Sequence, residues 1–426
     1  MIRWEAPLAT SPVNGLFAVP GSKSTTARSF MLAALADAPG EVIGALSARD
    51  TTLMRQALGQ FGVRFDDVTL DRVLVSPPAV FHAAGRIDCG LAGTVLRFLP
   101  PIAALIDGPT EFVGDAEAAA RPVAPLLGAL ADLGATVTTP YHLPFTVTGG
   151  VLVRGGAVAL DASDSSQFIS ALLLAGARFP EGLAVRHTGH RMPSLPHIVM
   201  TVRMLRGRGV RIAEPESGVW VVDPGPIASV IDRVEPDLTN AASLLAAAVA
   251  TGGRLTTRWP EHSLQPADAL ADVLAAFGAD LSYSVGPAGR MLTVAGPDRV
   301  RGVELDLQAT SEFTPVAAAL AVLADSPSVL HGVGHIRGHE SDRLAALEAE
   351  LCGLGADVRQ LPDGLDLRPR PLRGGVFHTH ADHRLAHAGA LLGLVTPGVV
   401  LDDVTCTTKT LPNFAGLWTS MVEGRT

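Results

Sequence analysis

The stretch TSEFTPVAAALAVLA (residues 310–324) decides the fold, because five other segments of the chain repeat its design. In each, a short polar cluster leads into a run of Ala and Leu that is apolar on nearly every side, which is typical of a buried helix. The other copies begin with GSKST at 21, CGLAG at 89, SDSSQ at 163, PDLTN at 236 and ADHRL at 381. Measured between Lys23, Leu91, Ser165, Thr239, Glu312 and His383, the spacings are 68, 74, 74, 73 and 71 residues.

A second element keeps the same period. It is an amphipathic run that ends in Gly and is followed by a β-type stretch, as in FGVRF and LGADV. Gly after such a run is the common signal for the end of a helix. The glycines Gly62, Gly134, Gly209, Gly278 and Gly355 are 72, 75, 69 and 77 residues apart. The repeat therefore predicts six β-α-β-α-β-β units, in which the first helix is buried and the second has one polar face.

Six such units exceed one hydrophobic core, so we expect an α/β protein of two domains with three units each. The composition, 47% hydrophobic and 18% charged, excludes disorder, collagen and coiled coil. No apolar run is long enough to span a membrane, and the N-terminus lacks the pattern of a signal peptide. Three scattered cysteines suit the cytoplasm, and the net charge of −9 argues against nucleic acid as a partner.

Lysine is rare in this chain and therefore informative. Of 33 basic residues, only Lys23 and Lys409 are lysine, and the others are arginine. Both could occur by chance, or each could mark a place where a compact ammonium is required and a planar guanidinium does not fit.

The polar clusters precede buried helices, whose N-termini attract anions. Ordinary N-caps explain Asp237 and Thr239. They do not explain cations in or near these segments, because a cation at a helix N-terminus opposes the dipole. An anionic ligand would account for them. The cations are Lys23, Arg28, Arg97, His383 and Arg384.

Several motifs have a plainer alternative. PGSKS, which ends at Ser24, lacks the Gly spacing of a nucleotide-binding loop, which excludes an ATP-dependent kinase of that class. Residues 165–167 (SSQ) suit phosphate or sugar oxygens, or simply cap a helix. Residues 334–343 (GHIRGHESDR) are dense in ionisable groups and indicate either a site or a solvated loop.

Four histidines have spacings that could bind zinc, but Arg384 lies among them and would repel a cation, so we expect an anion site and no metal. Cys89 and Cys406 have no activating base nearby in sequence, and we interpret both as packing residues. The four histidines are His378, His380, His383 and His387.

With PGSKS, AGTVLR, SSQF, ESDR, ADHR and TTKT in this order, the chain resembles the 5-enolpyruvylshikimate-3-phosphate synthase family of enolpyruvyl transferases from about residue 12 to 420. It is most similar to the form found in high-GC actinobacteria. The resemblance implies a two-domain enolpyruvyl transferase fold, an inside-out α/β barrel with three β-α-β-α-β-β repeats per domain around a pseudo-threefold axis. It places the domains at 20–234 and at 1–19 plus 235–426.

The implied reaction transfers the enolpyruvyl (carboxyvinyl) group of phosphoenolpyruvate to the 5-hydroxyl of shikimate 3-phosphate, on the shikimate pathway to chorismate and aromatic amino acids. A tetrahedral intermediate forms, phosphate is released, and no metal or organic cofactor takes part. The resemblance further implies a cytoplasmic monomer that glyphosate inhibits in the phosphoenolpyruvate pocket.

The resemblance also implies site residues. Glu312 corresponds to the base that takes the hydroxyl proton, and Glu340 to the acid that protonates the methylene carbon, with Lys23 and Lys409 as further catalytic groups. Phosphoenolpyruvate would contact Lys23, Gly93, Arg121, Gln167, Arg343, Arg384 and Lys409. Shikimate 3-phosphate would contact Lys23, Ser24, Arg28, Ser165, Ser166, Gln167, Ser194, Glu312 and His339.

Some positions depart from the commonest family pattern. Glu312 stands where Asp is usual, and His339 stands where Lys is frequent. The family usually has Lys or Arg at the position of Ala119, so this change bears on substrate affinity. Further departures are Ala27, Leu91, His197 and His335.

Three other functions stay open. A UDP-N-acetylglucosamine enolpyruvyl transferase would have Lys-Asn in place of Lys23-Ser24 and a reactive Cys within 113–120, where this chain has none. A transferase with a secondary metabolite as acceptor would share the same motifs. A non-catalytic paralogue would not be expected to keep both carboxylates and both lysines.

Overall fold

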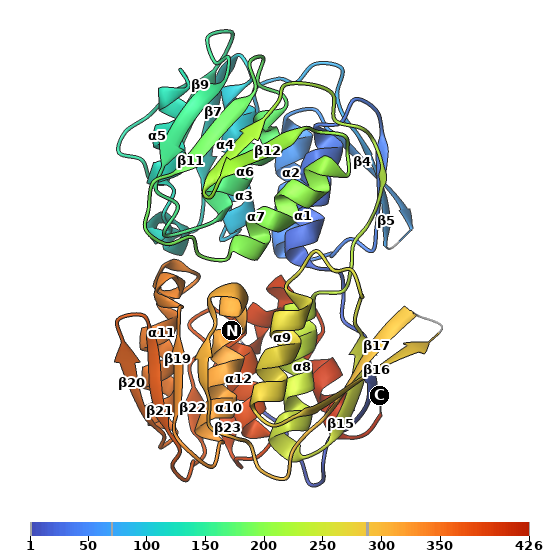
Figure 1. Ribbon diagram of the computed structural model, residues 1–426, viewed down its shortest axis with the longest axis vertical. Coiled ribbons are helices and arrows are strands. Elements are labelled where there is room, and N and C mark those ends of the chain that lie inside the picture. The colour runs from blue at the N-terminus through green and yellow to red at the C-terminus, as the bar shows by residue number, and fades with distance from the viewer. Residues whose placement is uncertain (1, 70, 287–288, 426) are drawn as a thin grey trace. The chain divides into compact units, whose positions relative to one another are not determined.

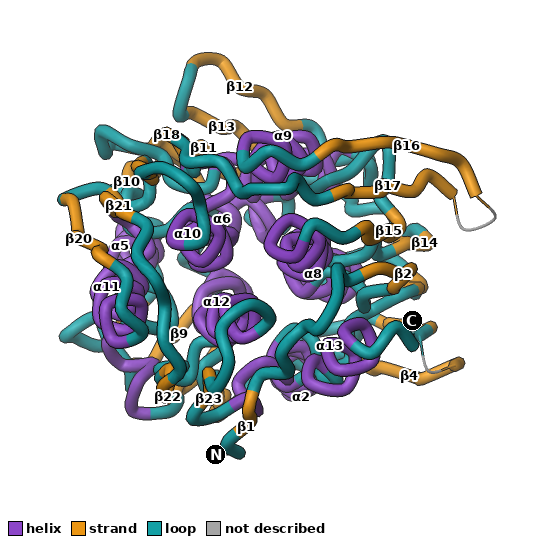
Figure 2. The backbone as a smooth tube through the Cα atoms, turned by 90° about the horizontal axis from the view of Figure 1, so that it is seen from below, coloured by secondary structure: helices purple, strands orange, loops and turns teal. Residues whose placement is uncertain are grey.

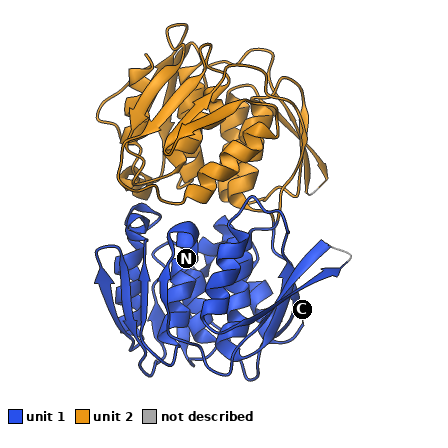
Figure 3. Ribbon diagram, viewed as in Figure 1, with its two compact units in different colours: residues 1–20, 236–426 blue, residues 21–235 orange. Residues whose placement is uncertain are grey.

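The computed structural model describes residues 2–69, 71–286 and 289–425 (Figure 1). The chain forms two compact units, and it passes between them after Pro20 and after Glu235. We call Gly21–Glu235 the central unit, and Met1–Pro20 with Pro236–Thr426 the terminal unit. Figure 3 colours the central unit orange and the terminal unit blue. Each consists of small sheets wrapped around buried helices, which confirms the predicted α/β repeat fold.

The central unit contains three four-stranded sheets in its described residues, ordered β14-β3-β5-β4, β6-β7-β9-β8 and β10-β11-β13-β12. In each sheet the first two strands are parallel and the remaining pairs are antiparallel. The strands are β3 (Gly40–Ile43), β4 (Arg64–Thr69), β5 (Arg72–Ser76), β6 (Gly85–Asp88), β7 (Gly108–Val113), β8 (Thr136–Val137), β9 (Phe145–Gly149), β10 (Gly156–Leu160), β11 (Leu183–His187), β12 (Ile212–Glu216), β13 (Val219–Val222) and β14 (Ile231–Arg233). The helices are α1 (Lys23–Ala34), α2 (Arg49–Gln60), α3 (Gly93–Phe98), α4 (Pro100–Ala104), the 3-10 turn η1 (Ala116–Ala120), α5 (Ala124–Asp132), α6 (Gln167–Gly176) and α7 (Leu195–Arg206).

The terminal unit repeats this arrangement with sheets β16-β17-β15-β2, β18-β19-β21-β20 and β1-β23-β22 in its described residues. The strands are β1 (Trp4–Glu5), β2 (Asn14–Phe17), β15 (Arg254–Arg258), β16 (Asp280–Gly286), β17 (Gly289–Ala295), β18 (Glu304–Asp306), β19 (Ser328–His331), β20 (Asp357–Leu361), β21 (Gly364–Arg368), β22 (Gly375–Phe377) and β23 (Val399–Leu401). The helices are α8 (Leu238–Thr251), α9 (Ala267–Ala276), α10 (Thr314–Val322), α11 (Arg343–Gly353), α12 (His383–Gly393) and α13 (Phe414–Val422), and the 3-10 turns are η2 (Gln308–Phe313), η3 (Gly334–Gly338) and η4 (Val404–Lys409).

Two strands belong to a different unit from the helix that follows them. β2 precedes α1 in the chain but pairs in parallel with β15, and β14 precedes α8 but pairs in parallel with β3. The sixth copy also differs from the others, because its described sheet has three strands and its antiparallel partner is β1 from the N-terminus. The regular spacing of the helices does not reveal either feature.

The first helix of each copy is buried, as predicted. All nine residues of α10 are buried, and α8 and α12 are buried along most of their lengths. Figure 2 shows α8, α10 and α12 close together with strands around them, and these three helices contact one another. The second helices α2, α5, α7, α9 and α11 bury one face only.

The five glycines of the sequence repeat end these second helices. Their φ angles are +101°, +98°, +78°, +104° and +103° at Gly62, Gly134, Gly209, Gly278 and Gly355. Only glycine adopts such values without strain, so the predicted helix ends are confirmed.

Candidate active site

In the terminal unit, the first turns of the buried helices meet. Nη1 of Arg384, in the first turn of α12, donates to Oδ1 of Asn240 in the first turn of α8 at 3.0 Å. Nε of the same Arg384 donates to Oε2 of Glu312 at 3.3 Å, and Glu312 lies in η2 just before α10. The polar clusters that begin the repeats therefore lie side by side.

The central unit has an equivalent meeting point around Arg28 of α1. Its Nη2 donates to Oγ of Ser170 on α6 at 3.3 Å, and its guanidinium lies 5.1 Å from the ring centroid of Phe98 on α3. One side chain thus touches all three buried helices of this unit.

Arg28 is 1% exposed and is held entirely by neutral acceptors. Nε donates to Oγ1 of Thr201 at 2.8 Å, and the Nη atoms donate to the carbonyls of Ser24 and His197 at 3.1 and 3.2 Å. Burial lowers the pKa of Arg28 to about 9, so the guanidinium is still charged at neutral pH. No described carboxylate pairs with it. A buried cation of this kind is suited to an anionic ligand.

Arg121 and Gly93 are in close contact. A Cβ at Gly93, the first residue of α3, would lie 2.8 to 3.0 Å from three atoms of the Arg121 guanidinium. Nη1 of Arg121 donates to the carbonyl of Leu91 at 2.9 Å, and no described carboxylate pairs with this arginine either. A side chain at position 93 would therefore displace the guanidinium from the start of α3.

Lys23 begins α1, where its Nζ lies 3.2 Å from Oδ2 of Asp50, a carboxylate that is 2% exposed. The sequence analysis missed Asp50, because nothing local to it distinguishes it from any Asp in the first turn of a helix.

The SSQ segment lies at the start of α6, where Oγ of Ser165 accepts from the backbone N–H of Gln167 at 3.3 Å, while the N-cap residue Ser166 makes no side-chain capping bond. The side-chain amide of Gln167 makes a further hydrogen bond, in which its Oε1 accepts from Nη1 of Arg97 at 3.0 Å. Ser194 caps α7 with φ of +50°, a left-handed conformation that is uncommon for serine. Such strain is concentrated at functional sites, and His380 and Ala381 show it just before α12.

Arg343 is the centre of the terminal-unit cluster and is fully buried. Nε lies 2.7 Å from Oδ2 of Asp382, Nη1 lies 3.0 Å from Oε2 of Glu312, and Nη2 lies 3.0 Å from Oε2 of Glu340. Burial lowers its pKa, but the three carboxylates outweigh burial and raise the pKa well above the usual value. Asp382 also accepts from the backbone N–H of Arg384, so it fixes both arginines.

Glu312 and Glu340 lie on two sides of this arginine. Burial raises the pKa of Glu312, but Arg343, His339 and Arg384 outweigh it and hold the pKa well below its usual range. Glu340 lies 2.5 Å from Nζ of Lys409, at the end of η4. With Asp382, the cluster therefore combines three carboxylates with three cations, Arg343, Arg384 and Lys409.

Two histidines border the two carboxylates. Nδ1 of His339 lies 3.3 Å from Oε1 of Glu312 and 3.0 Å from Nη1 of Arg343. The ring of His335 lies 5.6 Å from that of His339. Burial, together with the neighbouring His339, lowers the pKa of His335 to about 4, so His335 is neutral at neutral pH.

The other singled-out residues lie apart from these clusters or serve packing. His378 lies 3.0 Å from Asp402 and His380 lies 2.9 Å from Glu350, so the four histidines do not form one group. Burial raises the pKa of Cys89 and of Cys406 to about 12, which makes both unreactive thiols.

Sequence reasoning missed the residues that hold the predicted ones in place. Asn240 fixes Arg384, and Thr201 and Ser170 hold Arg28. These are short or neutral side chains on helices, so their function shows only when the helices pack together.

Among the described residues, neither a membrane-spanning helix nor a group of metal-binding side chains is found. In residues 2–69, 71–286 and 289–425, no helix is long and apolar enough to cross a membrane. The same residues contain no group of three or more His, Cys, Asp or Glu side chains that could hold a metal ion.

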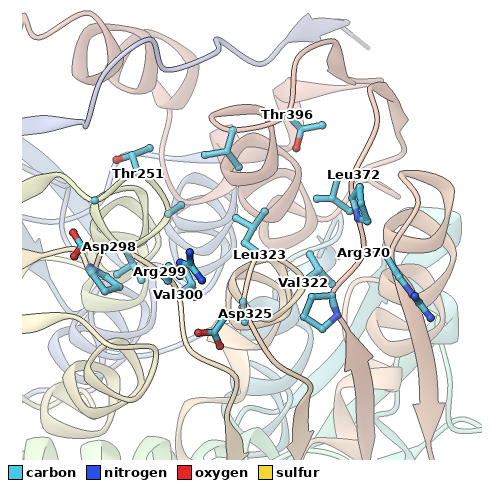
Figure 4. Close-up of a pocket in the computed structure, with 18 of the residues that line it drawn as sticks. Thr251, Asp298, Arg299, Val300, Val322, Leu323, Asp325, Arg370, Leu372 and Thr396 are labelled. Atoms are coloured by element: carbon cyan, nitrogen blue, oxygen red, sulfur yellow. The ribbon is translucent and has the colours of Figure 1, made fainter.

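A cavity of about 930 Å³ lies elsewhere in the terminal unit (Figure 4). It is lined by the C-terminal ends of α8 and α10, at Thr251 and Val322, and by Thr396 after α12. Since the charged cluster lies at the N-terminal ends of the same helices, this cavity is separate from it.

The chain matches known proteins along nearly its whole length. A sequence profile described as EPSP synthase (3-phosphoshikimate 1-carboxyvinyltransferase) matches residues 8–418. The curated 3-phosphoshikimate 1-carboxyvinyltransferase of Mycobacterium ulcerans (strain Agy99) is 50% identical over 428 residues, covering 99% of this chain and 98% of the relative.

Solved structures show the same fold. One EPSP synthase structure from Acinetobacter baumannii superimposes with a TM-score of 0.81 at 24% identity and covers 98% of both chains. A second from the same organism gives a TM-score of 0.79 at 23% identity over 97% of both chains.

Proposed function

The chain belongs to the EPSP synthase family, and from this premise we propose that it transfers the enolpyruvyl group of phosphoenolpyruvate to the 5-hydroxyl of shikimate 3-phosphate. The products are 5-enolpyruvylshikimate 3-phosphate and phosphate. This is the activity for which the Mycobacterium ulcerans relative is named, and the sequence analysis reached the same reaction from six motifs.

The observation that carries the proposal is the arrangement around Arg343. A guanidinium touches Glu312 and Glu340, and Lys409 lies on the far side of Glu340. Enolpyruvyl transfer needs a base for the hydroxyl and an acid for the methylene carbon, together with cations for a substrate that bears phosphate and carboxylate. One cluster supplies all three kinds of group.

In the proposed mechanism, Glu312 accepts the proton of the 5-hydroxyl while its oxygen attacks C2 of phosphoenolpyruvate. Glu340 protonates the methylene carbon, and a tetrahedral intermediate results. Glu340 then removes a proton from the new methyl group as phosphate leaves. The phosphate and carboxylate of the donor compete with Glu312 and Glu340 for Arg343, Arg384 and Lys409. This competition weakens the pull of the cations on the carboxylates and raises their pKa values toward those useful for proton transfer.

For shikimate 3-phosphate we propose Lys23, Ser24, Arg28, Ser165, Ser166, Gln167, Ser194, Glu312 and His339. For phosphoenolpyruvate we propose Lys23, Gly93, Arg121, Gln167, Arg343, Arg384 and Lys409. The buried guanidinium of Arg28, which has only neutral partners, supports an anion at this position. Glyphosate, an anion that would occupy the donor site, is proposed as an inhibitor. The monomeric state and the cytoplasmic location stay predictions.

The test is a measurement of phosphate release from phosphoenolpyruvate with each acceptor in turn, with identification of the product by mass spectrometry. We expect release with shikimate 3-phosphate and none with UDP-N-acetylglucosamine. Release with the nucleotide sugar alone would replace the proposed acceptor. No release with either, from a protein that melts cooperatively, would favour a secondary metabolite as acceptor or a non-catalytic paralogue.

A further inference from the structure

Nδ1 of His339 lies within hydrogen-bonding distance of a donor and of an acceptor, and it cannot bond to both at the same time. Nδ1 is 3.0 Å from Nη1 of Arg343 and 3.3 Å from Oε1 of Glu312. The guanidinium only donates, so it needs the lone pair of Nδ1, whereas the carboxylate only accepts, so it needs a proton there. The geometry therefore provides a partner for each protonation state of the same nitrogen.

The cations around Glu312 make its carboxyl group a weak holder of a proton. Arg343 and Arg384 outweigh desolvation and hold the pKa of Glu312 well below its usual range. A proton taken from a hydroxyl would be held weakly by such a group. The adjacent imidazole has a ring nitrogen that can accept a proton from the carboxyl group across a short contact.

We propose that Nδ1 of His339 receives, by way of Glu312, the proton that leaves the 5-hydroxyl, an inference that rests on the proposed function. The hydroxyl O–H bond breaks as its oxygen bonds to C2 of the donor. The proton passes to Oε1 of Glu312 and then to the lone pair of Nδ1. When the intermediate collapses, the proton returns through Glu312 and leaves on the phosphate. His339 ends the cycle as it began, so no other reactant is needed.

The charged and titratable groups around His339 are consistent with this path. Glu312 faces it from η2, Arg343 from α11, and Glu340 is its neighbour in the chain. Arg384 of α12 reaches the other oxygen of Glu312, and His335 of η3 stacks edge-on. His335 is neutral at neutral pH and does not supply a competing charge. A lysine in place of His339 would already carry its proton at neutral pH. It could pair with Glu312 but could not accept a further proton.

The first experiment measures kcat against pH at saturating concentrations of both substrates. For the wild type we expect an acid limb, a fall of kcat on the acid side, because a protonated Nδ1 can no longer accept the proton. In His339→Gln this limb should disappear and kcat at neutral pH should fall by roughly 10- to 100-fold. Ionisation of the substrates themselves is common to both proteins, so the difference between the two profiles belongs to His339.

The matched control is His335→Asn, which changes the adjacent histidine and should keep the acid limb where the wild type has it. If His339→Gln raises KM but retains the limb, His339 serves only to hold substrate and the proposal is overturned. A wild type that forms no enolpyruvyl product would instead overturn the proposed function, so the two failures are distinguishable.

The second experiment is chemical rescue of His339→Ala with added imidazoles of different basicity. If the ring stores a proton, turnover should rise with imidazole concentration, and should depend on the pKa of the imidazole added. A rescue that is the same for all imidazoles, or no rescue of a folded variant, would contradict proton storage at this position.

Discussion

The polar clusters at the starts of the buried helices differ between the two units in what their arginines contact. In the central unit, Arg28 and Arg121 lie against hydroxyls, carbonyls and an aromatic ring, with no carboxylate partner among the described residues. In the terminal unit, the single side chain of Arg343 contacts three carboxylates, those of Glu312, Glu340 and Asp382. The same repeat therefore produced one cluster in which two arginines have no described carboxylate partner and one in which acids and cations alternate.

This difference indicates a division of labour. Unneutralised buried guanidinium groups are costly without an anion and favour binding one, so the central cluster is suited to holding the phosphate of a substrate. Carboxylates beside cations have pKa values that depend on what else the cations bind, so the terminal cluster is suited to moving protons. Substitutions in the two clusters should consequently affect different kinetic constants.

The largest effect is expected for Glu312→Gln, which keeps size and hydrogen bonding but removes the base. Turnover should fall by roughly 10²- to 10⁴-fold while shikimate 3-phosphate still binds, and Glu312→Asp should recover part of the rate. Steady-state kinetics with thermal melts provide the measurement. The control is Glu350→Gln, a buried carboxylate of the same unit that pairs with His380 away from the cluster. A folded Gln variant with near-normal turnover would remove Glu312 from the mechanism.

A smaller effect, on binding, is expected for Arg28→Lys. The guanidinium donates to Thr201, Ser24, Ser170 and His197, and a lysine cannot reproduce this set of bonds. Loss of about one charge-assisted hydrogen bond to phosphate should raise the Kd for shikimate 3-phosphate by about 10- to 100-fold, as isothermal titration would show. Arg208→Lys is the control, because Arg208 is equally buried in the same unit but pairs with Asp232. Equal losses in both variants would contradict a specific role for Arg28.

The next effect concerns the donor pocket. A methyl group at Gly93 would press on the Arg121 guanidinium at 2.8 to 3.0 Å, and this flexible end can shift at a cost. We expect glyphosate to compete with phosphoenolpyruvate in the wild type, and Gly93→Ala to raise its inhibition constant by more than about tenfold, with a smaller change in the KM for phosphoenolpyruvate. Gly59→Ala, at an open position in α2, should change neither. A wild type that is already resistant would refute this description of the pocket.

The smallest effect is on stability against pH. Burial, with a contribution from His339, lowers the pKa of His335 from 6.5 to about 4 in the folded protein. The unfolded chain therefore binds this proton first, so stability should be lost as pH falls from about 6.5 to 4 and should level off below that. The free energy at stake is of order 3 kcal/mol. His335→Asn should show a flatter dependence of the melting temperature on pH over this range, and an unchanged slope would show that His335 is not responsible.

Most of the repeat fold could be predicted from local patterns. Apolar helices that begin at Lys23 and near Glu312, and helix ends at Gly62 and Gly355, follow from rules that act within one segment. The pairing of β2 with β15 and of β14 with β3 could not be predicted, because strand partners are chosen by tertiary packing far from the strand itself.

The candidate site shows the same limit. Ionisable residues such as Arg343 and Lys409 stood out in the sequence because they are rare or occur in dense clusters. Asp50, Asn240 and Thr201 did not, since each is an ordinary residue of an ordinary helix until packing brings it against a cation. The network that sets the pKa of Glu312 likewise joins three segments that are remote in sequence.

The division between binding and chemistry is tested most directly by single-turnover formation of 5-enolpyruvylshikimate 3-phosphate at saturating substrate, measured for Arg28→Lys and Glu312→Gln side by side. The account predicts a near-normal rate for Arg28→Lys once the site is filled, and a rate at least 100-fold lower for Glu312→Gln. A slow Arg28→Lys with a fast Glu312→Gln, or equal losses in both, would contradict it.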